Sequence, residues 1–221
     1  MTEFQSKRYK KIYDIFISKF YDFGLKIGLT PVGEKILRIS VFKALSPYIK
    51  RGNRILDLCC GTGTLTILLA QLLYKECKIV GVDLSPGQIA QAQKKNRHPN
   101  LKFAVMDANN TKFSNGYFDH VVVSAALHEM DKIQRKNVLS EIHRILKKGG
   151  IFLVFEHHEP SKISLRILYN FYLGFFEKIL SHSFEMQRQV LKELKQAGFK
   201  ILKQTFIKNF FSFFQILISI K

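Results

Sequence analysis

The segment Asp57-Leu58-Cys59-Cys60-Gly61-Thr62-Gly63 combines residue types that suit the binding of a charged small molecule. It follows a short apolar stretch at 54–58 and precedes a helical pattern at 64–74. Glycines in such a strand-to-helix turn let the backbone approach a ligand closely, and the first turn of the helix offers unpaired N–H donors. The carboxylate of Asp57 favours a ligand that carries a cationic amino-acid group near this turn.

The same turn could be mistaken for the dinucleotide-binding fingerprint G-x-G-x-x-G. That fingerprint is incomplete here, because Thr66 stands at the position of its third glycine. An acidic residue four positions before the first glycine does not belong to it either. The turn therefore favours an amino-acid ligand over a pyrophosphate.

Two further carboxylates follow the next two strand-like stretches, Asp83 after 78–82 and Asp107 after 101–105. A carboxylate at Asp83 can accept hydrogen bonds from both ribose hydroxyls of an adenosine ligand. Asp107 and its neighbouring amides can meet an adenine edge. A structural glycine turn alone would not need carboxylates at the ends of three successive strands.

Strands and helices alternate along the middle of the chain. The patterns predict strands at 54–58, 78–82, 101–105, 118–124 and 151–155, and helices at 64–74, 85–96 and 131–147. This alternation predicts an α/β fold, a Rossmann-like, doubly wound parallel sheet covered on both faces. Two more predicted strands, 199–206 and 210–220, complete a seven-stranded sheet with an antiparallel last strand, and a helix at 186–197 precedes them.

The quoted motifs resemble a known family. The runs are ILDLCCGTGTLTILLA, GVDLSPGQIAQAQKK, MDANN, YFDHVVVSAALHEM and EIHRILKKGGIFLVFEHHEP. They are similar to class I S-adenosylmethionine-dependent methyltransferases, and most similar to the ubiquinone/menaquinone C-methyltransferase-like branch. The resemblance covers about residues 50–160. It implies S-adenosyl-L-methionine as cofactor and S-adenosyl-L-homocysteine as product.

The resemblance also implies which residues hold the cofactor. Its methionine end would lie against Asp57 and the turn Cys60, Gly61, Thr62, Gly63. The ribose would lie against Asp83 and Leu84, and the adenine against Asp107 and Ala108. Ser124, with Ala125, would close the pocket after the fourth strand.

Methyl transfer from a sulfonium needs mainly positioning, and a general base only where the acceptor arrives protonated. His128 lies just beyond the fourth strand, near the expected acceptor, and an imidazole suits a base near neutral pH. The alternative for His128 is a histidine at a helix start that makes ordinary surface hydrogen bonds. The signature Asn/Asp-Pro-Pro-Tyr/Phe is absent after the fourth strand, which disfavours adenine or glutamine amino groups as acceptors.

No metal is expected, because the adjacent His157 and His158 would point to opposite faces of an extended chain. Cys59 and Cys60 are expected to pack as small residues, since the reaction needs no thiol nucleophile. Three cysteines cannot form a disulfide framework, and the default expectation is a reducing, cytoplasmic setting.

The expected organisation is a single domain over 1–221. A helical extension (1–50) precedes the cofactor-binding core (51–160), and a helical cap (161–185) precedes the C-terminal helix and strand pair (186–221). Apolar residues recur at helical spacing between 12 and 27, and aromatic residues crowd the stretch 163–180. The aromatic stretch would cover a lipophilic acceptor, lie on a membrane surface, or pack on the sheet.

The chain carries 35 basic and 17 acidic side chains, a net charge of +18, and much of that excess lies in 1–53 and 160–221. Such a charge favours anionic partners, although a lysine-rich composition alone also gives a basic solvated surface. We expect a small or lipophilic acceptor, such as a quinone precursor or a lipid, with peripheral contact to an anionic membrane. RNA methylation and a cofactor-binding protein without catalysis are the alternatives, and no appended RNA-binding module supports the first.

Overall fold

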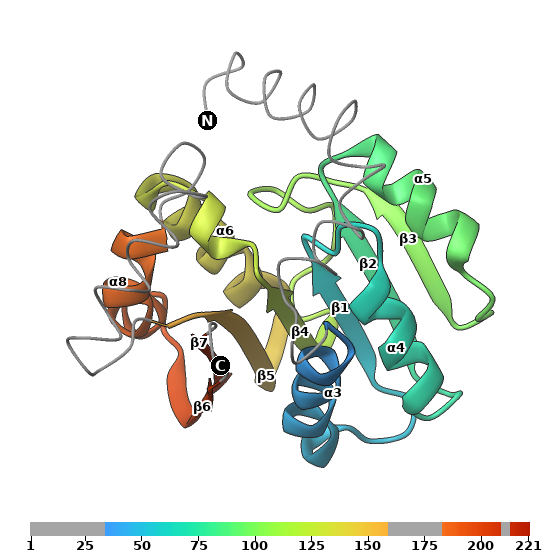
Figure 1. Cartoon of the computed structure of the whole chain (residues 1–221), viewed down its shortest axis with the longest axis horizontal. Helices are drawn as coiled ribbons and strands as arrows, with labels where there is room; N and C mark the ends of the chain where they lie inside the picture. Colours follow the sequence, from blue (N-terminus) through green and yellow to red (C-terminus); the bar gives the residue numbers. More distant parts are fainter. Residues whose placement is uncertain (1–33, 159–182, 209–212) are drawn as a thin grey trace.

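The computed structural model describes residues 34–158, 183–208 and 213–221. Its centre is a seven-stranded sheet in the order β3-β2-β1-β4-β5-β7-β6 (Figure 1). The strands are β1 Arg54–Leu58, β2 Lys78–Asp83, β3 Leu101–Val105, β4 Phe118–Ser124, β5 Leu146–His157, β6 Lys200–Lys208 and β7 Phe213–Ile220. Strands β1 to β5 pair in parallel, and β7 is antiparallel to both β5 and β6. The expected doubly wound sheet with an antiparallel last strand is confirmed.

Helices cover both faces of this sheet. The described helices are α3 Glu34–Leu45, η2 Ser46–Tyr48, α4 Thr64–Leu72, α5 Pro86–Lys95, η3 Leu127–Glu129, α6 Lys132–Ile145 and α8 Ser183–Gln196. One face packs against α3, α4 and α5, and the other against α6 and α8. Two of these helices begin at a residue whose side chain caps the helix. Ser85 accepts a hydrogen bond from Gln88 N, and Asp131 forms a capping box with Gln134.

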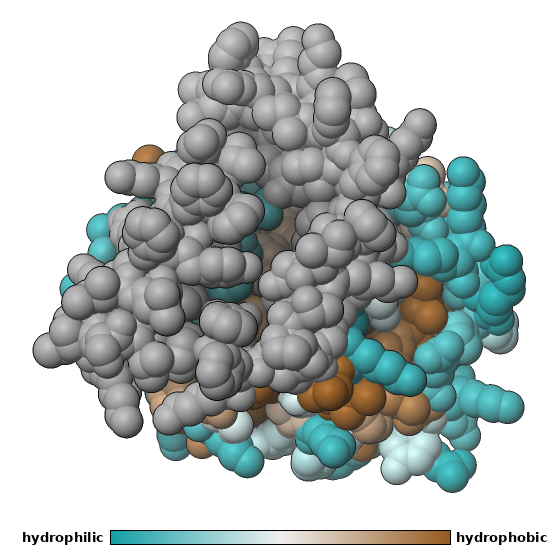
Figure 2. Space-filling view, in the orientation of Figure 1, coloured by the Kyte–Doolittle hydropathy of each residue, from teal (hydrophilic) through white to brown (hydrophobic). Residues whose placement is uncertain are grey.

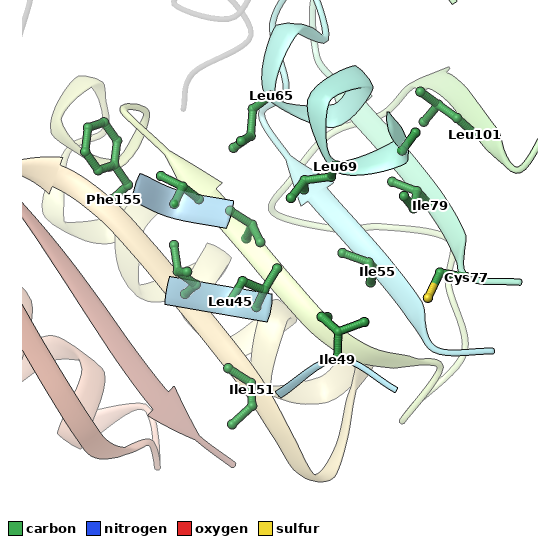
Figure 3. Packing of buried hydrophobic residues seen from close by; sticks show 14 of the residues in the cluster. Leu45, Ile49, Ile55, Leu65, Leu69, Cys77, Ile79, Leu101, Ile151 and Phe155 are labelled. Atoms are coloured by element: carbon green, nitrogen blue, oxygen red, sulfur yellow. The ribbon is translucent and has the colours of Figure 1, made fainter. Parts of the chain in front are cut away.

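Alternation along β1 assigns its side chains to the two faces of the sheet. Ile55 belongs to the core on the α3–α4 side, whereas Leu56 and Leu58 belong to the core on the α6–α8 side. Figure 3 shows side chains of α3 and α4, among them Leu45 and Leu69, pointing toward the strands of the first core. Asp57 therefore faces the α4 side, where Thr66 lies.

Most predicted elements match the structure within a few residues, and two differ in a physical detail. The predicted strand 151–155 begins earlier, at Leu146, because Leu146 pairs with Phe118 ahead of an irregularity in the β4–β5 register. The C-terminal strand pair is placed with β7 inside the sheet and only β6 at the edge. The predicted helical stretches at 12–27 and 163–180 lie outside the described residues.

The surface is mixed in character. Figure 2 shows apolar side chains over α3 and α4, where Ile36 and Leu72 are exposed, and hydrophilic side chains on the side of the molecule where α5 lies. Across the part of the chain that the structure describes, no helix is long and apolar enough to cross a membrane.

Candidate cofactor site and catalytic pair

The three predicted carboxylates lie at the carboxyl ends of three neighbouring strands. Asp57 is in β1, Asp83 ends β2, and Asp107 follows β3. Because β1 pairs with both β2 and β4, the chain changes direction across the sheet at this point. Ligands of open α/β sheets bind outside the carboxyl ends of the strands at such a point.

A pocket opens at this edge of the sheet. It is lined by Cys59, Asp83, Leu84, Met106, Asp107, Ala108, Asn109, Ala126, Glu129, Met130 and Gln134. Four of the predicted cofactor residues are therefore brought together in it, namely Asp83, Leu84, Asp107 and Ala108. Asp57, Cys60, Gly61, Thr62, Gly63 and Ser124 are not among the lining residues, although the turn that carries most of them adjoins Cys59.

The charge of this pocket is suited to a cation. Among the described residues that line it, Asp83, Asp107 and Glu129 are the charged ones, and none is a lysine or arginine. A pyrophosphate would meet like charge here, whereas S-adenosylmethionine carries a sulfonium and an ammonium. The residues present therefore fit that cofactor and disfavour a dinucleotide.

Backbone amides hold the carboxylate of Asp83 in a fixed position. Its Oδ2 accepts a hydrogen bond from Gly61 N at 2.8 Å, and its Oδ1 accepts one from Ser85 N at 2.9 Å. Burial raises the pKa of Asp83 and outweighs the opposing effect of these amide hydrogen bonds. Each carboxylate oxygen can accept a second hydrogen bond, so the group can bind a ribose diol.

Asp57 is fully enclosed and tied to helix α4. Its side chain is 1% exposed, and Thr66 Oγ1 donates a hydrogen bond to Asp57 Oδ2 at 2.6 Å. Burial raises the pKa of Asp57 to about 6, and the hydrogen bond from Thr66 and the charge of Arg38 oppose the rise. The Asp57 carboxyl therefore changes between its neutral and ionised forms near pH 6, and only the ionised form attracts a cationic ligand.

The glycine turn is shaped by close packing as well as by backbone conformation. Gly63 has φ of +74°, and a Cβ there would come within 2.5 Å of the Phe103 ring. A Cβ at Gly81 in β2 would come within 2.6 Å of the same ring. The Phe103 ring thus occupies the space that side chains at positions 63 and 81 would need. The glycine turn can therefore pack closely against β2 and β3.

Cys59 has a left-handed backbone that is unusual for its residue type. Its φ is +62°, and it lines the pocket beside Asp83. Burial raises the pKa of the Cys59 thiol well above its usual range, so the thiol stays protonated. The expectation that Cys59 is only a packed small residue misses its place in the pocket wall. The neighbouring Cys60 is partly buried, and desolvation likewise raises the pKa of its thiol well above the usual range.

The loop after β3 forms one wall of the pocket. Asp107 Oδ1 accepts hydrogen bonds from Asn109 N at 2.9 Å and from Asn109 Nδ2 at 2.8 Å. These two bonds fix the loop and place Ala108, which is nearly buried, against the pocket.

His128 lies in η3, directly after β4, and it is buried at 8% exposure. Its Nδ1 lies 2.8 Å from Oε2 of Glu156, near the end of β5. The alternative of ordinary surface hydrogen bonds is therefore wrong. Residues Ala126, Glu129 and Met130 of the same turn line the pocket, so His128 sits beside it.

Glu156 is a functional candidate that the sequence reasoning missed. It is fully buried, and its Oε1 accepts hydrogen bonds from Ala126 N and Leu127 N at 2.8 and 2.7 Å. Burial alone would raise its pKa, but the attraction of His128 and these hydrogen bonds lower it below its ordinary value. The available signal was a single carboxylate at the end of the apolar run Ile151–Phe155.

Ser124, the last residue of β4, is partly buried. The next residue, Ala125, has a φ of +52°, and its backbone N donates a hydrogen bond to Phe155 O at 2.8 Å. The rings of His128 and His157 meet edge to face at 5.2 Å. Within 34–158, 183–208 and 213–221, no group of histidine, cysteine, aspartate and glutamate is arranged to hold a metal ion.

Comparisons with known proteins agree with this geometry. A family model described as a methyltransferase domain matches residues 55–150. An uncharacterized methyltransferase of Synechocystis sp. is 35% identical over 161 residues, which cover 73% of this chain and 71% of that protein. The chain belongs to the class I S-adenosylmethionine-dependent methyltransferases. The chain is also similar to the demethylmenaquinone methyltransferase of Staphylococcus epidermidis, at 26% identity over 96% of this chain and 86% of that protein.

The fold of this methyltransferase is shared with solved structures. Phosphoethanolamine N-methyltransferase 2 of Haemonchus contortus, in complex with S-adenosyl-L-methionine, superposes with a TM-score of 0.69. The sequence identity is 18%, and the match covers 96% of this chain and 60% of that one. As a member of this family, the chain uses S-adenosylmethionine as its cofactor.

Proposed function

We propose that this methyltransferase acts on a lipophilic aromatic acceptor with an ionisable hydroxyl group, of the quinol type, and that His128 is its general base. The observation that carries the proposal is the hydrogen bond between His128 and the fully buried Glu156, beside the pocket. A methyltransferase that only positions two reactants needs no such pair. An acceptor that arrives protonated does need one.

The two halves of the proposed site are carried by different strands of the sheet. The cofactor residues end β1, β2 and β3, whereas His128 follows β4 and is held by Glu156 of β5. Ala126, Glu129 and Met130, which share the turn with His128, line the pocket. An acceptor beside β4 and β5 would therefore meet the methyl group next to the imidazole.

When bound, S-adenosylmethionine supplies a methyl group on a positive sulfur, which leaves as a neutral thioether that keeps the electron pair of the broken bond. Glu156 is ionised and can only accept, so Nδ1 of His128 donates to it, and in the neutral form of His128 the imidazole lone pair lies on Nε2. Nε2 would take the hydroxyl proton of the acceptor. The charge released into the ring makes a ring carbon the nucleophile. After the new C–C bond forms, that carbon releases its own proton to solvent, and the imidazolium of His128 returns the first proton to the ring oxygen.

The names of the relatives, rather than the aromatic packing beside His128, support an aromatic acceptor, because the rings of Phe155 and Phe214 are buried in the core. The ring of His157 lies 5.2 Å from that of His128 and 4.7 Å from that of Phe214, and Phe214 stacks on Phe155 at 4.9 Å. Several relatives act, by their names, on demethylmenaquinone. These names favour a quinone precursor over a polar metabolite.

We also propose that a groove between α6 and α8 contacts an anionic membrane, where a lipophilic acceptor would be found. Lys132, Lys136 and His143 line this groove together with Ile133, whose side chain is 71% exposed. An exposed apolar side chain between lysines is typical of a surface that binds to anionic lipid headgroups. The carboxylate of Glu193 in the groove is bonded to Arg135, so it offsets the lysines little.

The experiment that tests the acceptor class uses S-adenosylmethionine labelled on its methyl group. The purified protein is incubated with the labelled cofactor and a whole-cell extract, and products are partitioned between organic solvent and water. Label in the organic phase supports the lipophilic acceptor. Label confined to the aqueous phase contradicts it, and if ribonuclease releases that label, RNA is the acceptor. No transfer above a sample without protein contradicts catalysis with any acceptor in that extract.

A further inference from the structure

Both walls of the cofactor pocket are attached to one helix, α6, by buried ionic groups that do not line the pocket. One wall is the turn 126–130 after β4. The other is the loop 107–111 after β3. Arg135 holds the first and Glu141 holds the second, and both side chains belong to α6.

Arg135 is fully buried, with 0% of its side chain exposed. Its Nε and Nη2 donate to the two carboxylate oxygens of Glu193 in α8, at 2.8 and 2.9 Å. Its Nη1 donates to the carbonyl oxygen of Met130 at 2.7 Å. The planar guanidinium is therefore oriented by α8, and its remaining side presents a donor to the wall of the pocket.

Glu141 makes the corresponding contact on the other wall. Its Oε1 accepts hydrogen bonds from the backbone N of Thr111 at 2.7 Å and from the Thr111 hydroxyl. Arg144 fixes this carboxylate with Nε and Nη2, each at 2.7 Å. Thr111 is itself buried and lies two residues after Asn109, a lining residue of the pocket.

We propose that Arg135 and Glu141 are positioning residues for the cofactor, which act through Met130 and Thr111 respectively. A buried ion pair is a weak source of stability, because the cost of desolvation offsets much of the attraction. A purely structural role on α6 would be served by an apolar side chain. Here the two buried charges instead direct hydrogen bonds to the backbone of opposite pocket walls, which sets the width of the pocket.

The test measures binding of S-adenosylhomocysteine by calorimetry, which needs no knowledge of the acceptor. We expect Arg135→Met and Glu141→Gln each to raise its Kd by about tenfold, because a displaced wall loses contacts with the adenosine. Once transfer is established, KM for S-adenosylmethionine is expected to rise with little change in kcat. Arg135→Lys is expected to restore part of the affinity, since lysine keeps the charge and one donor.

Leu194→Ala is the matched control, because Leu194 is fully buried, lies next to Glu193 in α8 and makes only apolar contacts in the core. It is expected to lower stability and leave the Kd within about twofold. Should Arg135→Met or Glu141→Gln prove too unstable to purify, Arg135→Lys and Thr111→Val replace them, since each removes only part of the contact. A Kd unchanged in these variants, with a stability loss like that of Leu194→Ala, would overturn the proposal.

Discussion

One carboxylate, that of Glu156, holds both a histidine and the backbone of the turn that carries it. Oε2 of Glu156 lies 2.8 Å from Nδ1 of His128, and Oε1 accepts from the amides of Ala126 and Leu127. The imidazole thus has little freedom to turn away from the site. Such a second partner is what fixes the tautomer of a histidine base.

His128→Asn tests the proposed base, because the asparagine amide can still donate toward Glu156 but cannot take a proton. We expect kcat for the acceptor identified by labelling to fall by about 100-fold or more. The Kd of S-adenosylhomocysteine should stay within about twofold, since His128 does not line the pocket. Unchanged transfer across pH 6–9 would rule out His128 as the base.

Asp57 gives cofactor binding a predictable dependence on pH. Its pKa is raised to about 6 by burial, so the carboxylate is mostly ionised at pH 7 and mostly protonated at pH 5. If the ionised form attracts the ammonium group of the cofactor, the affinity for S-adenosylhomocysteine falls by about tenfold from pH 7 to pH 5. Calorimetry at several pH values measures this slope.

Asp57→Asn is expected to bind more weakly at pH 7 and to lose the slope. Asp119→Asn is the control, since Asp119 is at the other end of the sheet, near the start of β4, and its pKa is lowered rather than raised. A slope that survives in Asp57→Asn would assign the pH dependence to another group.

Substitutions of Cys59, whose φ is positive, test whether this residue faces the bound ligand. Cys59→Gly removes the conformational cost of φ at +62° and opens the pocket slightly, so stability and the Kd of S-adenosylhomocysteine should change little. Cys59→Val adds a branched side chain, which strongly disfavours this φ and narrows the pocket. We expect it to unfold at a lower temperature and to bind about tenfold more weakly. Equal binding by both variants would show that residue 59 does not face the ligand.

Sedimentation with lipid vesicles tests the proposed membrane contact. The double variant Lys132→Glu/Lys136→Glu should bind phosphatidylglycerol vesicles less than the unmodified protein does, because two cations of the groove are reversed. Lys94→Glu/Lys102→Glu changes the net charge equally, but at α5 and β3, and should retain binding. Equal losses in both variants would mean that net charge, and not the groove, controls the contact.

The sequence predicts the fold and one half of the site for a physical reason. Strand and helix periods, the glycine turn and carboxylates at strand ends are local signals, and Asp83 and Asp107 follow from them. Glu156 and Arg135 do not, because each acts through a partner that is distant in the chain. Glu156 is 28 residues from His128, and Arg135 is 58 residues from Glu193. Only the pairing of β4 with β5 and the packing of α8 bring them together.

His120 in β4 makes the stability of the protein depend on pH. It is 5% exposed, its Nε2 lies 2.9 Å from Oδ1 of Asn53, and burial lowers its pKa from about 6.5 to about 4. Above pH 6.5 the histidine is neutral in both folded and unfolded chains, so it adds no pH dependence. Between pH 6.5 and 4 only the unfolded chain takes up the proton, and the free energy of unfolding falls by up to roughly 3 kcal/mol.

His120→Gln should remove that part of the acid sensitivity, since glutamine keeps a polar group near Asn53 and does not titrate. The measurement is urea unfolding at pH 7.5 and pH 5, and the quantity compared is the loss of unfolding free energy between the two. That loss should be smaller by about 2 kcal/mol in His120→Gln than in the unmodified protein. His98→Gln, in the loop before β3, is the control and should retain the full loss. An equal loss in His120→Gln would mean that His120 is already protonated in the folded protein at pH 5.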